Sequence, residues 1–359
     1  MGNFVTFGEA LVRMSPPGHQ RLEQPGNYFE IGPAGAELNV ACALALWNNN
    51  VRYVTTVPKD NPLAERLVAQ IRSYGVDTTY IQRTIGRLGL VFVETGASQR
   101  PSRVHYDREQ SSISLTVPAQ YKWGEIFDAT NHLHLTGITP ALSENAAAST
   151  MAAAKYAKKS GLRVSCDLNF RSKLWQWDAA KSAGELAGDI MREILPQVDV
   201  LIANETDLGD VLGLRSEVAE GDIDFDAYAR LARQAADTYP NLTHVAITLR
   251  ESISASRNRW GGLLLDRTAD QIYFAPEKNG IYHPYNIDKI VDRVGAGDSF
   301  AAGLLHAMYS DQYQTLSEAL DFAVAASCLA HSIPGDINHS NPSEIEALKA
   351  GNSTGRVQR

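Results

Sequence analysis

A short segment near the carboxyl end of the chain combines the residue types needed to bind and transfer a phosphoryl group. Residues 291–300 read VDRVGAGDSF, and an amphipathic helix is expected to begin within them. Gly295, Ala296 and Gly297 allow several backbone N–H groups to converge on one point, where a helix N-terminus also favours an anion. The carboxylate of Asp298 follows directly and could take a proton from an attacking hydroxyl. The alternative is an ordinary helix N-cap whose glycines allow tight packing.

Alternating strands and helices are expected to position that segment. The expected strands are short and apolar, whereas the helices carry apolar side chains at helical spacing. Strands are predicted at residues 3–8, 52–57, 132–135, 163–167, 198–203 and 245–249, and helices after residue 35 and at residues 63–74, 144–160, 178–195, 225–238, 297–308 and 315–331. This rhythm predicts an α/β fold in three αβα layers, with a mainly parallel central sheet and helices on both faces.

Two segments interrupt the alternation with short strands of their own. Residues 11–32 are rich in proline and glycine, and residues 88–110 contain two more expected strands. Together they are predicted to form a small β-sheet lid. Short strands between residues 250 and 291 indicate an antiparallel extension at one edge of the large sheet. We therefore expect one domain over residues 1–350 and a disordered tail at residues 351–359.

The composition argues against several other classes of protein. Of 359 residues, 44% are hydrophobic and 21% are charged, which is ordinary for a globular protein with a substantial core. The formal net charge of -8 lacks the basic surface that nucleic acid requires. The three cysteines form no CxxC pair, so neither a zinc site nor a disulfide framework is expected. No signal-peptide pattern and no membrane-spanning apolar stretch are present, which predicts a cytoplasmic protein without a membrane partner.

Residues 292–300 resemble the C-terminal signature DTxGAGDxF of the ribokinase/PfkB family of carbohydrate kinases, with Arg293 where the family usually has Thr. The resemblance extends over about residues 3–345. It implies a ribokinase-like fold that binds ATP and Mg²⁺. In such an enzyme the amides of the glycine-rich turn hold the phosphoryl group and Asp298 acts as the catalytic base.

Two further motifs resemble parts of the same family. Residues 32–41 (GPAGAELNVA) are similar to the signature GGAxxNVA, which implies that Gly35 lets a sugar approach the backbone and that Asn39 contacts sugar hydroxyls. The segment from Asn204 to Asp207 resembles the motif NxxE, which orders Mg²⁺ and the nucleotide phosphates through water. Here Asp207 replaces the usual Glu, and a shorter carboxylate still suits Mg²⁺. By itself this segment would indicate only a helix N-cap.

Within the family, several residues resemble those of the 2-keto-3-deoxygluconate kinases. Tyr106 and Arg108 match a Tyr and an Arg of the lid strand, and Arg171 matches the Arg of the segment DxNxRxxLW. An arginine fork is the natural partner of a substrate carboxylate. Asp336 is implied to contact the reducing end of the substrate. Either arginine could instead be a solvated or structural charge, because most surface charges serve no ligand.

The resemblance implies phosphorylation of the 6-hydroxyl of 2-keto-3-deoxygluconate by ATP. A fructokinase or ribokinase of the same fold is the nearest alternative, since DxNxR separates these sugars poorly. A sugar-sensing protein with a degraded kinase site is a third hypothesis. A nicotinamide dehydrogenase fits less well, because the glycines at residues 32–35 do not form GxGxxG after a first strand. The family also implies a homodimer that pairs through the lid.

Overall fold

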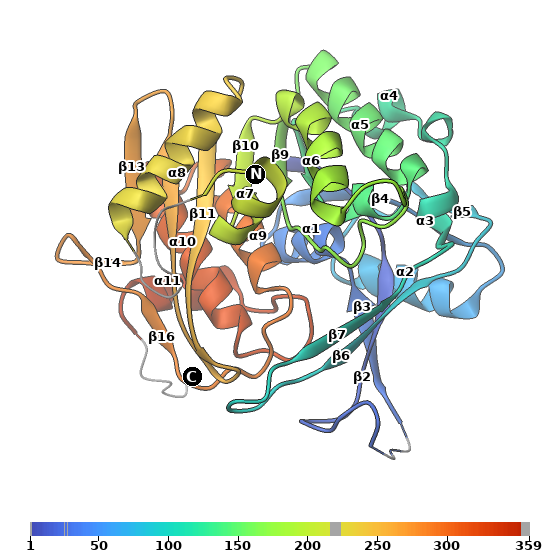
Figure 1. Ribbon diagram of the computed structural model, residues 1–359, viewed down its shortest axis with the longest axis horizontal. Coiled ribbons are helices and arrows are strands. Elements are labelled where there is room, and N and C mark those ends of the chain that lie inside the picture. Colours follow the sequence, from blue (N-terminus) through green and yellow to red (C-terminus); the bar gives the residue numbers. More distant parts are fainter. Residues whose placement is uncertain (1, 25, 27, 216–223, 353–359) are drawn as a thin grey trace.

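The protein builds one large and one small β-sheet, with helices on both faces of the large sheet (Figure 1). The computed structural model describes residues 2–24, 26, 28–215 and 224–352. The predicted fold class is confirmed: a mainly parallel central sheet, two helical layers and a smaller separate sheet. Of the predicted tail at 351–359, all but the first two residues lie outside the described residues.

The large sheet is parallel at its centre and antiparallel at one edge. The strands from β11 to β4 along the sheet run parallel, because helical crossovers connect them. The spatial order is β13 (Gln271–Ala275), β12 (Arg257–Asp266), β11 (His244–Ser254), β10 (Val200–Ala203), β9 (Arg163–Asp167), β8 (His132–Thr136), β1 (Asn3–Phe7), β4 (Asn50–Pro58) and β5 (Ile81–Thr84), with β16 (Tyr285–Ile287) beside β12. A small hairpin, β14 (Glu277–Lys278) and β15 (Ile281–Tyr282), stands apart.

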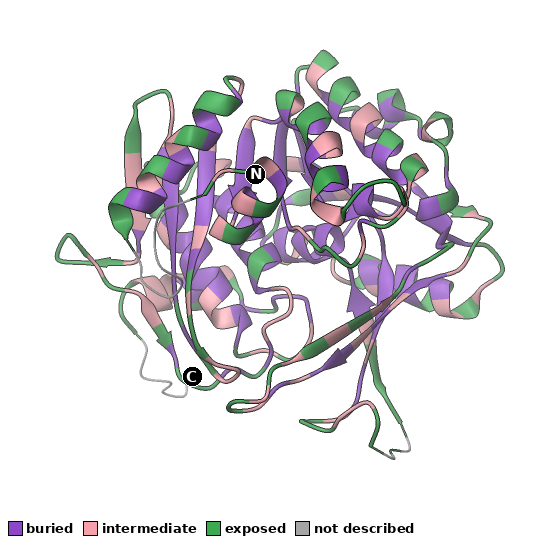
Figure 2. Cartoon of the chain, in the orientation of Figure 1, coloured by how far each residue is buried: buried purple, intermediate pink, exposed green. Residues whose placement is uncertain are grey.

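Each face of the large sheet packs on its own apolar core. In β1, Phe4 belongs to one core and Val5 and Phe7 to the other, because successive side chains of a strand point to opposite faces. The strands are accordingly buried and the outer sides of the helices exposed (Figure 2). The first face carries α1 (Ala36–Leu46), α2 (Pro62–Ser73), α9 (Ala296–Met308), α10 (Leu316–Ala330) and α11 (Pro342–Lys349), and the second carries α3 (Ser112–Leu115), α4 (Trp123–Ile126), α5 (Glu144–Lys159), α6 (Ala183–Ile194), α7 (Glu205–Leu212) and α8 (Phe225–Thr238).

The small sheet, called the lid sheet below, stands off the large sheet at the lower right of Figure 1. Its strands form two pairs from distant stretches of the chain, and the two pairs lie side by side in one sheet. The spatial order is β3 (Glu30–Ala34), β2 (Leu11–Ser15), β6 (Gly89–Glu94) and β7 (Arg103–Asp107).

Local signals explain where the predicted elements differ from the observed ones. The helix predicted from residue 178 begins at Ala183, because Ser182 and Glu185 form a capping box that fixes the start there. The strand predicted at 245–249 continues to Ser254, because β12 pairs with it along its length. The short elements α3, α4, α7, α11 and β5 were not predicted. No helix among the described residues is long and apolar enough to cross a membrane.

Candidate active site

A cavity of about 610 Å³ lies between the lid sheet and the carboxyl ends of the central strands. This edge is where ligands gather in open α/β sheets, and the volume suits a small ligand. All twelve residues predicted for the site line it: Gly35, Asn39, Tyr106, Arg108, Arg171, Asn204, Asp207, Gly295, Ala296, Gly297, Asp298 and Asp336. The structure therefore brings every predicted site residue to one cavity, and it leaves their individual roles as predictions.

The turn that precedes α9 presents free backbone N–H groups to the cavity. Gly295 is the N-cap of α9 and has φ of 81°, a left-handed conformation that glycine adopts without strain. A Cβ atom at this position would lie 2.0 Å from the carbonyl oxygen of Asp336. The amides of Gly295, Ala296 and Gly297 donate to no described residue. They are therefore available to an anion at the N-terminus of the helix.

Asp298 lies in the first turn of α9 with 8% of its surface exposed. Its Oδ2 accepts a hydrogen bond of 2.7 Å from Nδ2 of Asn39, which comes from α1. Burial raises the pKa of Asp298 to about 7, against the opposing effect of the Asn39 hydrogen bond, and the charge of Asp336 adds to the rise. A carboxyl group of this pKa can exchange a proton near neutral pH.

A second group of carboxylates follows β9 and β10. Asn204 caps α7: its side chain accepts from the amide of Asp207 at 2.8 Å and donates to the Asp207 carboxylate at 3.0 Å. Burial raises the pKa of Asp207 to about 6. Burial, together with the charges of Asp207 and Asp298, raises the pKa of Asp167. Such oxygen ligands fit a hard cation, although no cluster that would hold a metal by itself occurs among the described residues.

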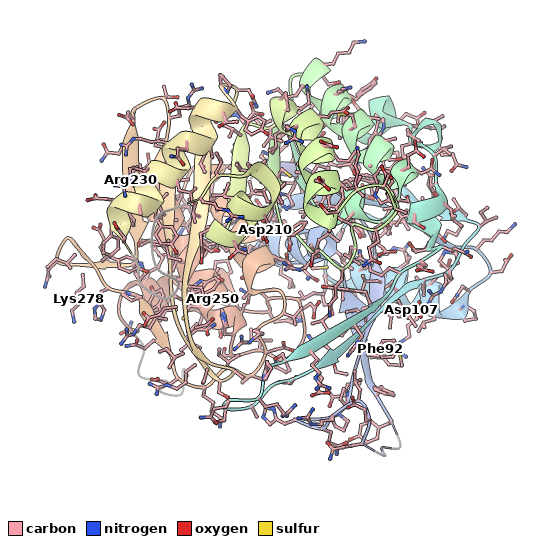
Figure 3. All side chains as sticks on the ribbon, viewed as in Figure 1. Phe92, Asp107, Asp210, Arg230, Arg250 and Lys278 are labelled. Atoms are coloured by element: carbon pink, nitrogen blue, oxygen red, sulfur yellow. The ribbon has the colours of Figure 1, made fainter. Side chains whose placement is uncertain are left out.

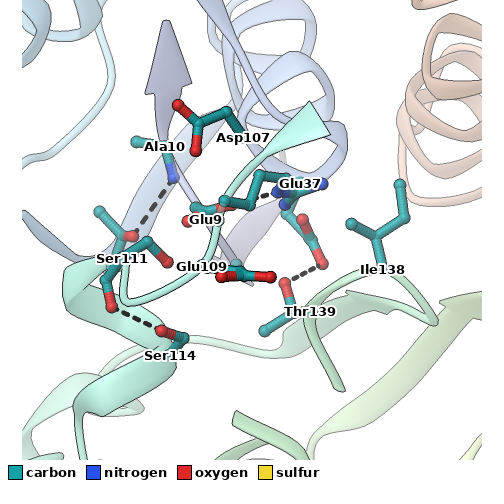
Figure 4. A network of polar contacts seen from close by, with 12 residues as sticks. Glu9, Ala10, Glu37, Asp107, Glu109, Ser111, Ser114, Ile138 and Thr139 are labelled. Atoms are coloured by element: carbon teal, nitrogen blue, oxygen red, sulfur yellow. Dashed lines mark hydrogen bonds and ion pairs between the residues drawn. The ribbon is translucent and has the colours of Figure 1, made fainter. Parts of the chain in front are cut away.

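Arg108, just after β7, is held by a carboxylate from the segment between β1 and β2. It is 7% exposed, its Nε pairs with the carboxylate of Glu9, and its guanidinium lies 5.9 Å from the ring centre of Tyr106. The terminal nitrogens of Arg108 donate to no described residue. Glu9 and Glu37 lie close together in this region, and Glu37 accepts a hydrogen bond of 2.8 Å from Thr139 (Figure 4). Sequence reasoning missed Glu9, whose role appears only because the fold brings the segment between β1 and β2 against the end of β7.

Arg171 remains available to a ligand. It follows β9, is exposed, and pairs with no acidic side chain among the described residues. Its charge nevertheless acts on the carboxyl groups of Asp207 and Asp298, where it opposes the rise in pKa. The alternative of a structural ion pair for Arg171 is therefore not observed in the described part of the chain.

Two arginines that were not predicted as site residues line the other end of the cavity. Arg250 lies near the end of the parallel part of β11 and is exposed (Figure 3). The guanidinium of Arg293 donates to the carbonyl oxygen of Ala255 at 2.6 Å. Burial and the neighbouring charge of Arg250 lower the pKa of Arg293. Two arginines in the lining of one cavity favour an anionic ligand, because each can donate charge-assisted hydrogen bonds to it.

Comparison with known proteins agrees with this geometry. The chain is 30% identical to the 2-dehydro-3-deoxygalactonokinase of Haloferax volcanii, over 98% of each chain. It is 27% identical to a probable fructokinase-3 of Arabidopsis thaliana, over 97% of this chain and 90% of that one. The crystal structure of 2-dehydro-3-deoxygluconokinase from Thermotoga maritima is 40% identical, with a TM-score of 0.88 over 98% of this chain and 100% of that chain. The family profile described as pfkB family carbohydrate kinase matches residues 1–249 and 264–344, so the chain belongs to the pfkB family of carbohydrate kinases.

Proposed function

We propose that this carbohydrate kinase transfers the terminal phosphoryl group of ATP to the 6-hydroxyl of 2-keto-3-deoxygluconate or a closely related sugar acid. The observation that carries the proposal is the composition of one cavity. Free amides and a carboxyl group of pKa about 7 lie at the start of α9, and two arginines lie elsewhere along the wall. The relatives named as kinases of 2-dehydro-3-deoxy sugar acids support the same substrate class.

The sugar acid would lie under the lid sheet with its carboxylate toward the arginines. Arg171 has no acidic partner among the described residues, and Arg108 has unused terminal nitrogens beside Tyr106. Both can donate charge-assisted hydrogen bonds to a substrate carboxylate. Neutral sugars such as fructose have no carboxylate to accept them. Asn39 would contact a sugar hydroxyl, since its Oδ1 has no donor among the described residues. Asp336 lines the same cavity and would face the reducing end.

The chemical step follows from the position of Asp298. Its carboxylate takes the proton of the 6-hydroxyl while that oxygen bonds to the γ-phosphorus, and the bond from phosphorus to the β-phosphate oxygen breaks to release ADP. The amides of Gly295, Ala296 and Gly297 hold the phosphoryl oxygens as charge develops on them. The products are the 6-phosphate of the sugar acid and ADP, and the proton remains on the carboxyl group until solvent removes it.

The nucleotide phosphates would lie between α9 and the end of β10. Arg250 and Arg293 line the cavity and supply positive charge there, and neither forms a salt bridge among the described residues. Asp207, with Asn204, would hold Mg²⁺ through water molecules, and the ion would neutralise the phosphate charge. Closure of the lid would exclude water and limit the hydrolysis of ATP.

We also propose that residues 1–350 act as one kinase domain and that two copies associate through the lid sheet. Three large apolar side chains are exposed around the start of β3: Tyr28 and Phe29 just before it and Ile31 within it, of which Tyr28 is 64% exposed. Phe29 contacts Phe92, which lies on the lid in Figure 3. Such a patch is typical of an association surface. A dimer in solution that Ile31→Asp converts to a monomer would support this arrangement, and a monomeric wild type would refute it. Location in the cytoplasm stays a prediction.

A panel of sugars with ADP release as the readout tests the substrate. We expect the highest kcat/KM with a 2-keto-3-deoxy sugar acid. A preference for fructose or ribose would contradict the sugar-acid assignment and leave the kinase activity intact. Ligand binding without release of ADP by any sugar would instead favour a sensing protein.

A further inference from the structure

A buried arginine of the lid sheet joins two segments that frame the turn before α9. Arg13, on β2, is 6% exposed. Its Nη2 donates to Oδ2 of Asp292 and its Nη1 to Oδ1 of Asp336, both at 2.6 Å. Its Nε donates to the hydroxyl of Ser15 at 2.8 Å. The three sides of the guanidinium are thus engaged, and the guanidinium bridges residues more than 270 positions away in the chain.

Asp292 transmits this contact to the backbone of the turn. Its Oδ1 accepts hydrogen bonds from the amides of Arg293 at 2.8 Å and Val294 at 3.1 Å. Its Oδ2, which also faces Arg13, accepts from the amide of Gly335 at 3.2 Å. One carboxylate therefore fixes the backbone directly before the phosphoryl-binding turn and ties it to the segment that contains Asp336.

Asp336 transmits the contact to the cavity. Its carbonyl oxygen packs so closely against Gly295 that no side chain fits there, and its side chain lines the cavity. The charge of Asp336 contributes to the raised pKa of Asp298, after the larger effect of burial. Burial of Arg13 disfavours its charged form, but the carboxylates of Asp336 and Asp292 outweigh this effect and raise the pKa of Arg13 above its ordinary value. The guanidinium accordingly stays charged and offsets Asp336.

We propose that Arg13 is a positioning residue of the phosphoryl transfer, which acts by holding Asp292 and Asp336 so that the α9 turn and Asp298 keep their geometry beneath the lid. This inference rests on the proposed kinase activity. Arg13 thus links the lid sheet to the phosphoryl-binding turn by hydrogen-bonded ion pairs, beside the apolar packing of Val294 against the lid. The simpler reading is a buried ion network that only stabilises the fold, and such networks are weak evidence for stability.

Two substitutions separate these readings because they remove different properties of Arg13. Arg13→Lys keeps the charge and loses the fork that reaches both carboxylates. We expect its kcat to fall about 10- to 100-fold, the equivalent of one charge-assisted hydrogen bond, with smaller changes in KM. Arg13→Gln loses the charge as well, so the acid limb of its kcat profile is expected to move to higher pH because Asp336 is no longer offset.

The groups that set this acid limb can be named. Asp298 interacts with the charges of Asp336, Arg171, Glu37 and Asp167, and Asp336 with those of Arg13 and Asp292. The substitutions alter only the interactions of Arg13 with Asp292 and Asp336. Because Arg13→Lys keeps the positive charge, its acid limb should stay in place. A role in folding alone would lower the amount of active protein and leave the profile of the remaining enzyme unchanged.

Arg103→Gln is the matched control. Arg103 is also a lid-sheet arginine in an ion pair, at 3.3 Å from Glu23, but its side chain is 47% exposed and does not line the cavity. It should keep the wild-type kcat and pH profile. All variants are assayed as purified full-length chain with the best sugar of the panel and ATP. Wild-type kcat in Arg13→Lys, its failure to fold, or an unmoved acid limb in Arg13→Gln would overturn the proposal; if Arg13→Gln does not fold, Arg13→Lys decides alone. An inactive wild type would refute the kinase proposal itself.

Discussion

Replacing Asp298 with asparagine removes the proposed base with little change of shape. Asn39 can still donate its hydrogen bond to the oxygen of the new amide, as it does now to Oδ2 at 2.7 Å. The amides of the turn are untouched. The variant therefore isolates proton removal from phosphoryl binding.

The size of the kinetic effect follows from the role of a general base. Such a group contributes about 100- to 10,000-fold to the rate, or about 3 to 5 kcal/mol in the barrier. The remaining rate would come from the turn and the positioning of the substrates. We expect kcat to fall within this range, while the dissociation constant for ATP changes little.

The same substitution should raise the stability of the protein at high pH. The pKa of Asp298 is about 7 in the folded protein against an ordinary value of 3.8. A raised carboxyl pKa means that the ionised form opposes folding. The stability present below pH 3.8 is lost as the pH rises to about 7. At 1.36 kcal/mol per unit the loss is at most about 4 kcal/mol, and Asp298→Asn avoids it.

Two measurements test this prediction together. ADP release gives kcat, and urea unfolding at pH 4 and pH 8 gives the free energy of unfolding for wild type and variant. We expect Asp298→Asn to be more stable than wild type at pH 8 and similar at pH 4. Near-normal kcat would refute the assignment of the base. Equal stability at both pH values would show that the carboxyl group is less buried than the structure indicates.

Three further substitutions probe other parts of the site. Arg171→Ala should raise KM for a sugar acid about 10- to 100-fold, the equivalent of a lost charge-assisted hydrogen bond, and should raise KM for fructose far less. Equal effects on both sugars would contradict the proposal that Arg171 binds the substrate carboxylate. Arg250→Ala should raise KM for ATP by a similar factor and leave KM for the sugar acid unchanged, and the reverse pattern would place Arg250 at the sugar. Gly295→Ala places a Cβ atom 2.0 Å from the carbonyl oxygen of Asp336 at φ of 81°, so both Tm and kcat should fall; a wild-type Tm would contradict the observed packing.

Much of the fold could be predicted because its signals are local. Apolar strands alternate with amphipathic helices, and several predicted bounds match, such as those of β9 and α8. The glycine-rich turn was predicted for the same reason, since positive φ and a helix N-cap depend on adjacent residues. The prediction was wrong at the start of α6, which was expected at residue 178 but lies at Ala183, where Ser182 and Glu185 form a capping box. It also missed short elements that only tertiary packing stabilises.

The sequence by itself determined which residues are able to bind phosphate, take a proton and pair with a carboxylate. Only the tertiary structure decided their partners, because each contact joins residues far apart in the chain. Asn39 reaches Asp298, Glu9 holds Arg108, and Arg13 spans from the lid to the turn before α9. No periodicity or spacing predicts such pairs. They arise because the parallel sheet brings its strand ends, the lid and one helix N-terminus to a single buried place, where an uncompensated charge is costly.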